Sequence, residues 1–322
     1  MRAVVFTGKG GNEVVSVEER PDPVPGSDEV LVTVRYAALN PADVSQRQGN
    51  YPAPPGSPAD VPGLEVSGVV AACGAGVRRF KEGDRVFGIV GGGGLADRVV
   101  AHDRHLVPVP ENLDELEAAA APEALITAHD AIVVQAGLRS GDLLLVNGAN
   151  GGGGTAAIQL ALVLGARVLA SVRSAEAREQ VAGLGVEVVA PDEAVARAKA
   201  EGGADVVLEL VGALNLAANF EALATKGRIM VVGTGAGADG EISLRALMSK
   251  RARLLGTVLR ARPIEEKAAA VQAFAHEVVP HLVSGRIRAL VDRTYPAADA
   301  AEAFDRLSGP GKFGKVLLDF SA

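Results

Sequence analysis

A run of glycines between two apolar segments places the strongest constraint on how this chain can fold. Residues 143–146 are apolar, glycines crowd residues 148–154, a helix-like segment follows, and residues 168–172 form a second apolar run. This order predicts one βαβ unit. Outward-pointing N–H groups and missing side chains at such a turn favour a pyrophosphate, which predicts cofactor contacts from Asn150, Gly151, Gly152 and Gly153. The alternative is a glycine-rich turn that only joins two buried elements.

The residues after the second apolar run indicate which dinucleotide is bound. In NAD-binding units an acidic residue about 20 positions on accepts hydrogen bonds from the ribose. Here Val172 occupies that place, followed by Arg173 and Ser174, with Arg178 one turn later. Valine accepts no hydrogen bond, whereas guanidinium and hydroxyl groups suit a 2′-phosphate. The pattern predicts NADPH; the alternative is that both arginines belong to a solvated helix face.

Composition limits the class of protein. The 322 residues suffice for two domains with cores of their own. A net charge of −7 offers no basic stripe, so we expect no nucleic-acid partner. One cysteine, Cys73, excludes a disulfide framework and a cysteine-rich zinc lobe. No apolar run approaches about 18 residues and no signal-peptide pattern is present, so we expect a cytoplasmic protein without a membrane anchor.

Two patterns divide the chain. Up to residue 126, short strand-like runs alternate with glycine, proline and charged turns, which suggests a compact β-barrel-like domain. From Thr127 onward, helical stretches alternate with apolar runs, which predicts a parallel doubly wound sheet with strands at 143–146, 168–172, 186–189, 206–210 and 229–232. Ligands lie beyond the carboxyl ends of such strands, so Val211, Gly233 and Thr234 are expected to approach the cofactor.

The remaining residues break this alternation. They predict a helix over 265–282, an extended segment over 286–295, a helix over 297–307 and a strand over 315–318. Because these pieces cannot extend the sheet as further βαβ units, we expect them to return to the first domain. The predicted limits are therefore 1–126 and 260–322 for one domain and 127–259 for the other.

Six motifs spread over essentially the whole chain resemble one family. They lie at residues 40–43, 49–51, 62–65, 148–152, 259–262 and 313–315. Together they are similar to the zinc-free quinone oxidoreductases of the medium-chain dehydrogenase/reductase superfamily. Residues 46–52 and 260–267 resemble the branch that includes the tumour-suppressor-inducible quinone reductase.

The resemblance implies a fold and a set of contacts. It implies an α/β protein with a GroES-like β-rich catalytic domain, an inserted Rossmann domain, and a homodimer. Zinc-dependent members would have cysteine at Asn40, histidine at Leu64 and cysteine near Glu123, and the residues present are not such ligands, so no metal is expected. Further cofactor contacts are implied for a group spread along the chain: Asn40, Tyr51, Thr127, Leu259, Arg260, Phe313 and Lys315.

Three positions depart from the family pattern. Many bacterial members have a lysine where Ala177 stands and a tyrosine near Asp192, and some have an aromatic residue where Ser45 stands. Arg173 and Arg178 must then supply the charge at the 2′-phosphate. Tyr51 is left as the main phenol of the expected cleft.

The predicted activity is hydride transfer from NADPH to a quinone. Tyr51 is the candidate proton donor, and Asn40 and Asp43 are expected to shape the nicotinamide pocket. The alternative for Tyr51 is a structural aromatic at the pocket mouth. Two rival functions remain open: reduction of an activated alkene, such as an enone or enoyl thioester, and noncatalytic NADPH binding by a redox-responsive protein.

Overall fold

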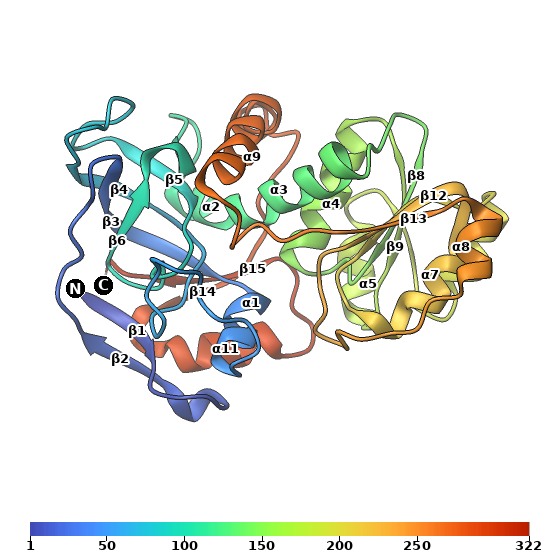
Figure 1. The fold of residues 1–322 in the computed structure, drawn as a ribbon, viewed down its shortest axis with the longest axis horizontal. Coiled ribbons are helices and arrows are strands. Elements are labelled where there is room, and N and C mark those ends of the chain that lie inside the picture. The colour runs from blue at the N-terminus through green and yellow to red at the C-terminus, as the bar shows by residue number, and fades with distance from the viewer. Residues whose placement is uncertain (322) are drawn as a thin grey trace. The chain divides into compact units, whose positions relative to one another are not determined.

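The computed structural model describes residues 1–321 and separates them into two compact units (Figure 1). Unit 1 comprises Met1–Ile126, Leu259–Pro310 and the chain from Gly314 onward. Unit 2 comprises Thr127–Val258 and takes in Gly311–Phe313. Unit 1 is therefore built from both ends of the sequence.

Unit 1 is organised around one mixed, largely antiparallel sheet with the strand order β14-β15-β3-β4-β5-β7, and β6 pairs with β3. Only the β14–β15 pair is parallel. A separate antiparallel pair is formed by β1 and β2. The strands are β1 Arg2–Phe6, β2 Val15–Glu19, β3 Glu29–Leu39, β4 Glu65–Cys73, β5 Arg85–Ile89, β6 Arg98–His102, β7 Leu106–Pro108, β14 Val291–Pro296 and β15 Lys315–Asp319.

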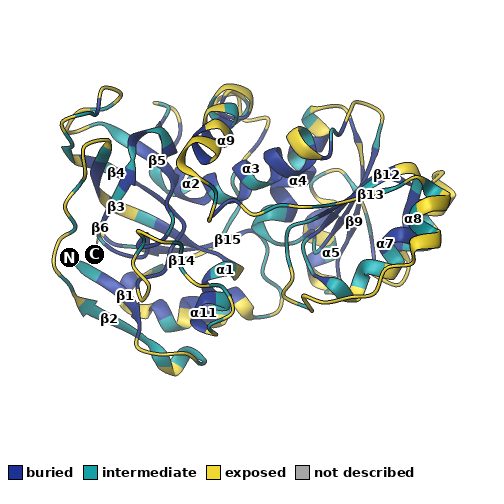
Figure 2. Ribbon diagram, viewed as in Figure 1, coloured by how far each residue is buried: buried dark blue, intermediate teal, exposed yellow. Residues whose placement is uncertain are grey.

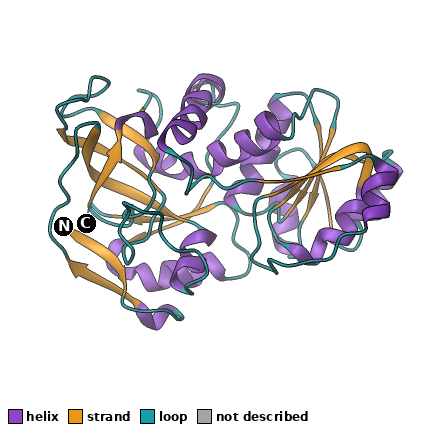
Figure 3. Cartoon of the chain, in the orientation of Figure 1, coloured by secondary structure: helices purple, strands orange, loops and turns teal. Residues whose placement is uncertain are grey.

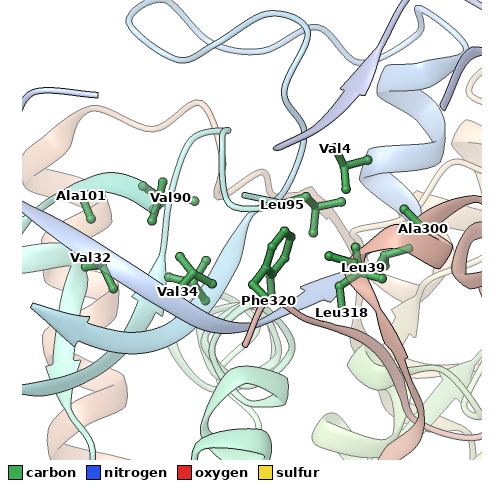
Figure 4. Close-up of a cluster of buried hydrophobic side chains, with 14 of the residues drawn as sticks. Val4, Val32, Val34, Leu39, Val90, Leu95, Ala101, Ala300, Leu318 and Phe320 are labelled. Atoms are coloured by element: carbon green, nitrogen blue, oxygen red, sulfur yellow. The ribbon is translucent and has the colours of Figure 1, made fainter. Parts of the chain in front are cut away.

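Alternation along β3 explains how this sheet covers its core. Val30, Val32 and Val34 are buried, while Thr33 and Arg35 between and beside them are exposed. The β-branched valines suit a pleated, half-buried surface. Figure 4 shows Val32, Val34, Leu95 and Phe320 among the side chains of the main hydrophobic cluster, which gathers residues from both ends of the chain.

The helices of unit 1 confirm most of the predicted pattern and correct one part of it. A single helix over 265–282 was expected, but the segment forms two helices that meet at Val278. Pro280 explains the break, since it lacks the N–H that a continuous helix would need. The helices are α1 Pro41–Arg47, α2 Glu115–Ala120, α3 Pro122–Ala128, α9 Ile264–Glu277, α10 Val279–Val283 and α11 Ala300–Ser308, with 3-10 turns Asn12–Val14, Asp103–His105 and Ala297–Asp299; α3 runs on into unit 2.

Unit 2 confirms the predicted parallel doubly wound sheet. Its six strands lie in the order β10-β9-β8-β11-β12-β13, and every neighbouring pair is parallel. Figure 3 shows these strands with helices packed alongside them. The strands are β8 Leu143–Asn147, β9 Arg167–Ser171, β10 Glu187–Val189, β11 Ala204–Glu209, β12 Leu223–Val231 and β13 Arg253–Gly256. The helices are α4 Gly152–Val163, α5 Ala175–Ala182, α6 Ala194–Ala200, α7 Leu216–Ala222 and α8 Leu244–Lys250, with a π-helix His129–Gln135 and a 3-10 turn Ala213–Asn215.

Strand β13 was not expected from the sequence. It lies at the edge of the sheet and its residues are exposed or half-buried, so the apolar run that marks the central strands is missing. Figure 2 shows the contrast between the buried central strands and the exposed surface of α8. None of the helices in the described chain combines the length and apolar character that crossing a bilayer requires.

Candidate functional site

The glycine turn of unit 2 joins the end of β8 to the start of α4. Gly148 has φ +76°, a left-handed conformation that glycine adopts without strain. A Cβ at Gly154 would lie 2.5 Å from Cα of Ala149, so the turn closes only if this position has no side chain. At Gly151, by contrast, the nearest atom to such a Cβ is 3.8 Å away. The turn is thus tightly packed on its inner side and accessible at Gly151.

The start of α4 fits a phosphate group. Gly151 is the N-cap residue and provides no side-chain cap, so the first N–H groups of this twelve-residue helix have no such partner. These groups and the helix dipole attract an anion. The Lys312 ammonium lies 3.8 Å from the Cβ position of Gly151, and the Asn150 amide donates to the Lys312 carbonyl at 3.0 Å. Lys312 was not predicted, although it directly precedes the Phe313 motif.

The residues after β9 offer basic groups where an NAD-binding protein would have a carboxylate. Val172 is buried and Arg173 is exposed. The Ser174 hydroxyl accepts a hydrogen bond from the Ala177 N–H at 3.5 Å and caps α5. The Arg178 guanidinium donates to the Val172 carbonyl at 3.4 Å, so it lies back over the end of the strand. Arg173 and Arg178 are thus the basic groups that could contact a cofactor at this end of β9.

A buried carboxylate, Glu209, organises the carboxyl end of the sheet, and sequence analysis missed it. Its Oε1 accepts hydrogen bonds from the Val211 and Gly212 N–H groups at 2.7 and 2.9 Å. Its Oε2 accepts from the Asn147 and Asn219 amides at 2.8 and 2.7 Å. Glu209 therefore ties the end of β8, the turn after β11 and helix α7 together. An acidic residue directly after the apolar run at residues 206–208 was the available signal.

Other predicted contacts in unit 2 lie near this turn or along its strands. A Cγ of Val211 is 3.0 Å from the Cβ position of Gly148, so Val211 is placed beside the glycine turn. Gly233 packs against the Leu210 carbonyl, 2.2 Å from its own Cβ position. Thr234 follows it, and the Thr127 hydroxyl is buried without a hydrogen-bond partner among the described residues. A polar ligand would satisfy that hydroxyl.

In unit 1 the predicted residues Asn40 and Lys315 meet around a buried carboxylate. Glu65 is fully buried, and its Oε1 lies 2.5 Å from the Lys315 ammonium. The Asn40 amide donates to the same oxygen at 3.0 Å, and its own oxygen accepts from Lys315 at 2.5 Å. The Glu123 N–H donates to the second oxygen of Glu65 at 2.8 Å. Both ends of the Asn40 amide are thus used within unit 1.

Two further carboxyl groups belong to this cluster. Asp43 is fully buried and accepts hydrogen bonds from the Asn40 and Gly63 N–H groups at 2.7 and 3.0 Å. Burial raises the pKa of Asp43 to about 6, against the effect of these two hydrogen bonds. Burial, reinforced by the neighbouring Glu65 charge, raises the pKa of Glu123 to about 7. Glu123 was not among the predicted site residues.

Arg260 fixes the segment that contains Tyr51. The Arg260 guanidinium is buried and donates to the Gly91 carbonyl and the Gln46 amide oxygen, both at 2.7 Å, and to the Tyr51 carbonyl at 3.3 Å. It also lies 5.3 Å from the centre of the Tyr51 ring, a cation–π arrangement. Burial raises the pKa of the Tyr51 phenol, and the Glu123 charge adds to this effect. The phenol is therefore protonated at neutral pH and is a weaker acid than a solvent-exposed tyrosine.

Two residues close to Arg260, Leu259 and Lys267, also belong to the site of unit 1. Leu259 is buried, and the Lys267 ammonium donates to the Arg260 carbonyl at 2.7 Å. In the part of the chain that the structure describes, no group of three or more His, Cys, Asp or Glu residues is arranged to hold a metal ion.

Comparison with known proteins supplies the family. Residues 26–111 match the alcohol dehydrogenase GroES-like domain, and residues 152–276 match the zinc-binding dehydrogenase domain. Quinone oxidoreductase of Rattus norvegicus is 33% identical over 327 residues, covering 99% of this chain and 97% of the relative.

Two solved structures cover almost the whole chain. An NAD-dependent alcohol dehydrogenase has a TM-score of 0.86 and 33% identity, with all of both chains covered. A mycobacterial protein complexed with NADPH has a TM-score of 0.89 and 26% identity, covering 99% of this chain and 100% of the other. The paired domain matches and the full-length similarity to curated quinone oxidoreductases show that this chain is an oxidoreductase belonging to the quinone oxidoreductase family of the medium-chain dehydrogenase/reductase superfamily.

Proposed function

We propose that this oxidoreductase reduces quinones with NADPH and without zinc. The observation that carries the choice of cofactor is the chain after β9, where Val172, Arg173 and Ser174 stand in place of a ribose-binding carboxylate. The two structural neighbours carry different cofactors in their descriptions, so overall similarity does not decide between NAD and NADP. Arg173 and Arg178 are the groups that would recognise the additional phosphate.

The chain's own residues would bind and orient the reactants. The start of α4, with Lys312 beside it, would hold the pyrophosphate, and the buried Thr127 hydroxyl would bond the ribose. When bound, the reduced nicotinamide supplies the hydride. Tyr51, whose phenol is protonated at neutral pH, would donate or orient the proton that the reduced quinone needs.

The buried cluster around Glu65 would serve as the rigid wall of the reaction site. Asn40 and Lys315 are held by Glu65, and Asp43 fixes the start of α1. Asn40 and Leu64 stand where zinc-dependent members would have ligands, and neither side chain suits zinc, which supports a metal-free reaction. Residues 1–126 and 260–322 would form the catalytic domain and residues 127–259 the cofactor domain of a cytoplasmic homodimer.

A cofactor and acceptor screen tests this proposal. The oxidation of NADPH and of NADH is measured with three acceptors: a simple benzoquinone, an enone and an enoyl thioester. The reaction is monitored as the loss of absorbance of the reduced nicotinamide. We expect turnover with benzoquinone and NADPH. Faster turnover of the enone or thioester would support the alkene reductase instead, and NADPH binding without turnover of any acceptor would support the noncatalytic alternative.

Variants of Arg173 test the cofactor assignment. Arg173→Ala should weaken NADPH binding about tenfold or more, the value of one charge-assisted hydrogen bond, and leave NADH binding unchanged. Arg245→Ala removes an exposed arginine elsewhere in unit 2 and serves as the control. Equal losses for the two cofactors would refute the assignment of the 2′-phosphate to Arg173.

A further inference from the structure

A cavity lies in unit 2 at the end of the strands opposite the glycine turn. It measures about 600 Å³, and its charged lining residues come from the segment before β8, from β12, and from the end of α8 and the start of β13: Arg139, Asp142, Lys226, Arg228, Arg251 and Arg253. Asp142 directly precedes β8, whereas Gly148 directly follows it. One five-residue strand, about 16 Å long, thus separates this cavity from the expected cofactor position.

The cavity concentrates positive charge in a chain whose net charge is −7. Five of its lining residues are cationic and one, Asp142, is acidic. Arg228 forms an ion pair with Asp142, since its guanidinium lies 3.2 Å from the carboxylate. The same guanidinium donates hydrogen bonds to the Ala136 and Gly137 carbonyls, both at 2.8 Å. Arg228 is therefore already paired and is held in place in the wall of the cavity.

The other four cations remain uncompensated. Arg139, Lys226, Arg251 and Arg253 are exposed, and none of them forms an ion pair with a carboxylate in the described part of the chain. Four like charges around one cavity repel one another, and a bound anion would relieve this repulsion.

The backbone adds an independent observation. Lys226 and Arg251 have φ values of 67° and 49°, and they are the only two non-glycine residues with positive φ among those described. Both line this cavity. Lys226 lies where β12 loses its regular register with β11, between the pairs Ala204–Leu223 and Val206–Arg228. Arg251 is the C-cap residue of α8, where a left-handed conformation is common, whereas Lys226 lies within a strand and no helix end explains its φ. Glycine would adopt both conformations without strain, and strained residues cluster at functional sites.

We propose that this cavity binds a small molecule carrying two or more phosphate groups, at a site separate from the cofactor turn. Guanidinium groups pair with phosphate oxygens through two parallel hydrogen bonds, and three of the four uncompensated cations are arginines. The volume of about 600 Å³ is that of an ordinary small-molecule site. Four cations match a multiply charged ligand better than a single phosphate. The inference is independent of the quinone reductase activity.

Titration with pyrophosphate tests the site. Isothermal titration calorimetry is performed on the full chain saturated with NADPH, so that the glycine turn is occupied. We expect saturable binding of one pyrophosphate per chain, weakened when the ionic strength rises. Absence of saturable binding would overturn the proposal.

Glycine substitutions give a variant that keeps its fold. Arg251→Gly and the double variant with Lys226→Gly remove charge at positions where glycine suits the backbone, so the melting temperature should not fall. Pyrophosphate affinity should drop about tenfold in the single variant and further in the double one. Two controls remove exposed charges of unit 2 that lie outside the cavity. Arg245→Gln removes one charge, and the combination of Arg245→Gln with Lys199→Gln removes two. Equal losses in variants and controls would show a nonspecific charge effect and refute the site.

Two further ligands define the chemical class. Inorganic phosphate should bind at least about tenfold more weakly than pyrophosphate, because it engages fewer of the cations. Citrate carries several carboxylates, and citrate binding as tight as that of pyrophosphate would refute the assignment to a phosphorylated ligand. The two proposals can fail separately. If the protein did not oxidise NADPH, the proposed activity would be refuted, but a loss of pyrophosphate binding in the glycine variants would still show that the ligand binds in the cavity.

Discussion

Replacing Lys315 by methionine should reveal the energetic weight of the buried ion pair in unit 1. The Lys315 and Glu65 side chains are 6% and 0% exposed, and their charged atoms are 2.5 Å apart. In Lys315→Met the Glu65 carboxylate stays buried and keeps only the Asn40 amide and the Glu123 N–H as donors. Removing one partner of such a pair costs about 3 to 5 kcal/mol. Methionine nearly conserves the volume, so a cavity adds little to this figure.

The chain offers a probe that reports on unit 1 alone. It has no tryptophan and three tyrosines, and Tyr36, Tyr51 and Tyr295 all belong to unit 1. Urea unfolding followed by tyrosine fluorescence therefore measures the unfolding of this unit even where the two units unfold separately. We expect the free energy of unfolding to fall by about 3 to 5 kcal/mol in Lys315→Met.

Two controls separate the ion pair from other effects. Arg104→Met breaks the exposed Arg104–Glu265 pair of the same unit and should cost less than about 1 kcal/mol. Combining Lys315→Met with Glu65→Gln should recover part of the loss, because no unpaired carboxylate is then buried. A loss below about 1 kcal/mol in Lys315→Met, or purely additive effects of the two substitutions, would refute the reasoning. NADPH affinity measured on the same variant tests the predicted cofactor contact of Lys315.

Three further predictions concern single side chains. Tyr51→Phe should lower kcat and leave the affinity for NADPH unchanged, and unchanged turnover would show that Tyr51 only packs. The pKa of Glu123 rises from 4.5 to about 7 on folding, so burying its charged form costs free energy and the stability of unit 1 falls as pH rises through this range. Glu123→Gln should flatten that decline. Parallel pH profiles of the two proteins would contradict this expectation. Glu209→Gln puts an NH2 group where the carboxylate accepts hydrogen bonds, and it should lower the free energy of unfolding of unit 2 by about 2 to 4 kcal/mol. The loss should be measurable as faster amide hydrogen exchange in β8 and β11. The control Glu201→Gln, at an exposed position, should have little effect.

Local patterns predicted most of the fold. The central strands of unit 2 are continuous apolar runs, and the glycine turn marks the passage from strand to helix, so both can be recognised within short windows. The edge strand β13 has half-exposed, partly charged residues and carries no such signal. The break near Val278 depended on one proline inside a helical pattern.

The site was less predictable because its contacts join distant residues. Lys315 and Asn40 are 275 positions apart, and no spacing rule relates them. Glu209 receives its hydrogen bonds from the ends of two strands and a helix, an arrangement that exists only once the sheet has formed. Lys312 is in a comparable position, since it reaches the turn at Gly151 from far along the chain. Residue types could be recognised, but their partners could not.

The position of β15 has a consequence for biosynthesis. This strand pairs with both β14 and β3, so the sheet of unit 1 remains incomplete until residues 315–319 have left the ribosome. At about 5 to 20 residues per second, the roughly 190 residues between Ile126 and Lys315 take about 10 to 40 s to translate. During that interval the segment Tyr36–Leu39 of β3 lacks its β15 partner, and nascent unit 1 would be open there to chaperone binding and to association with other chains.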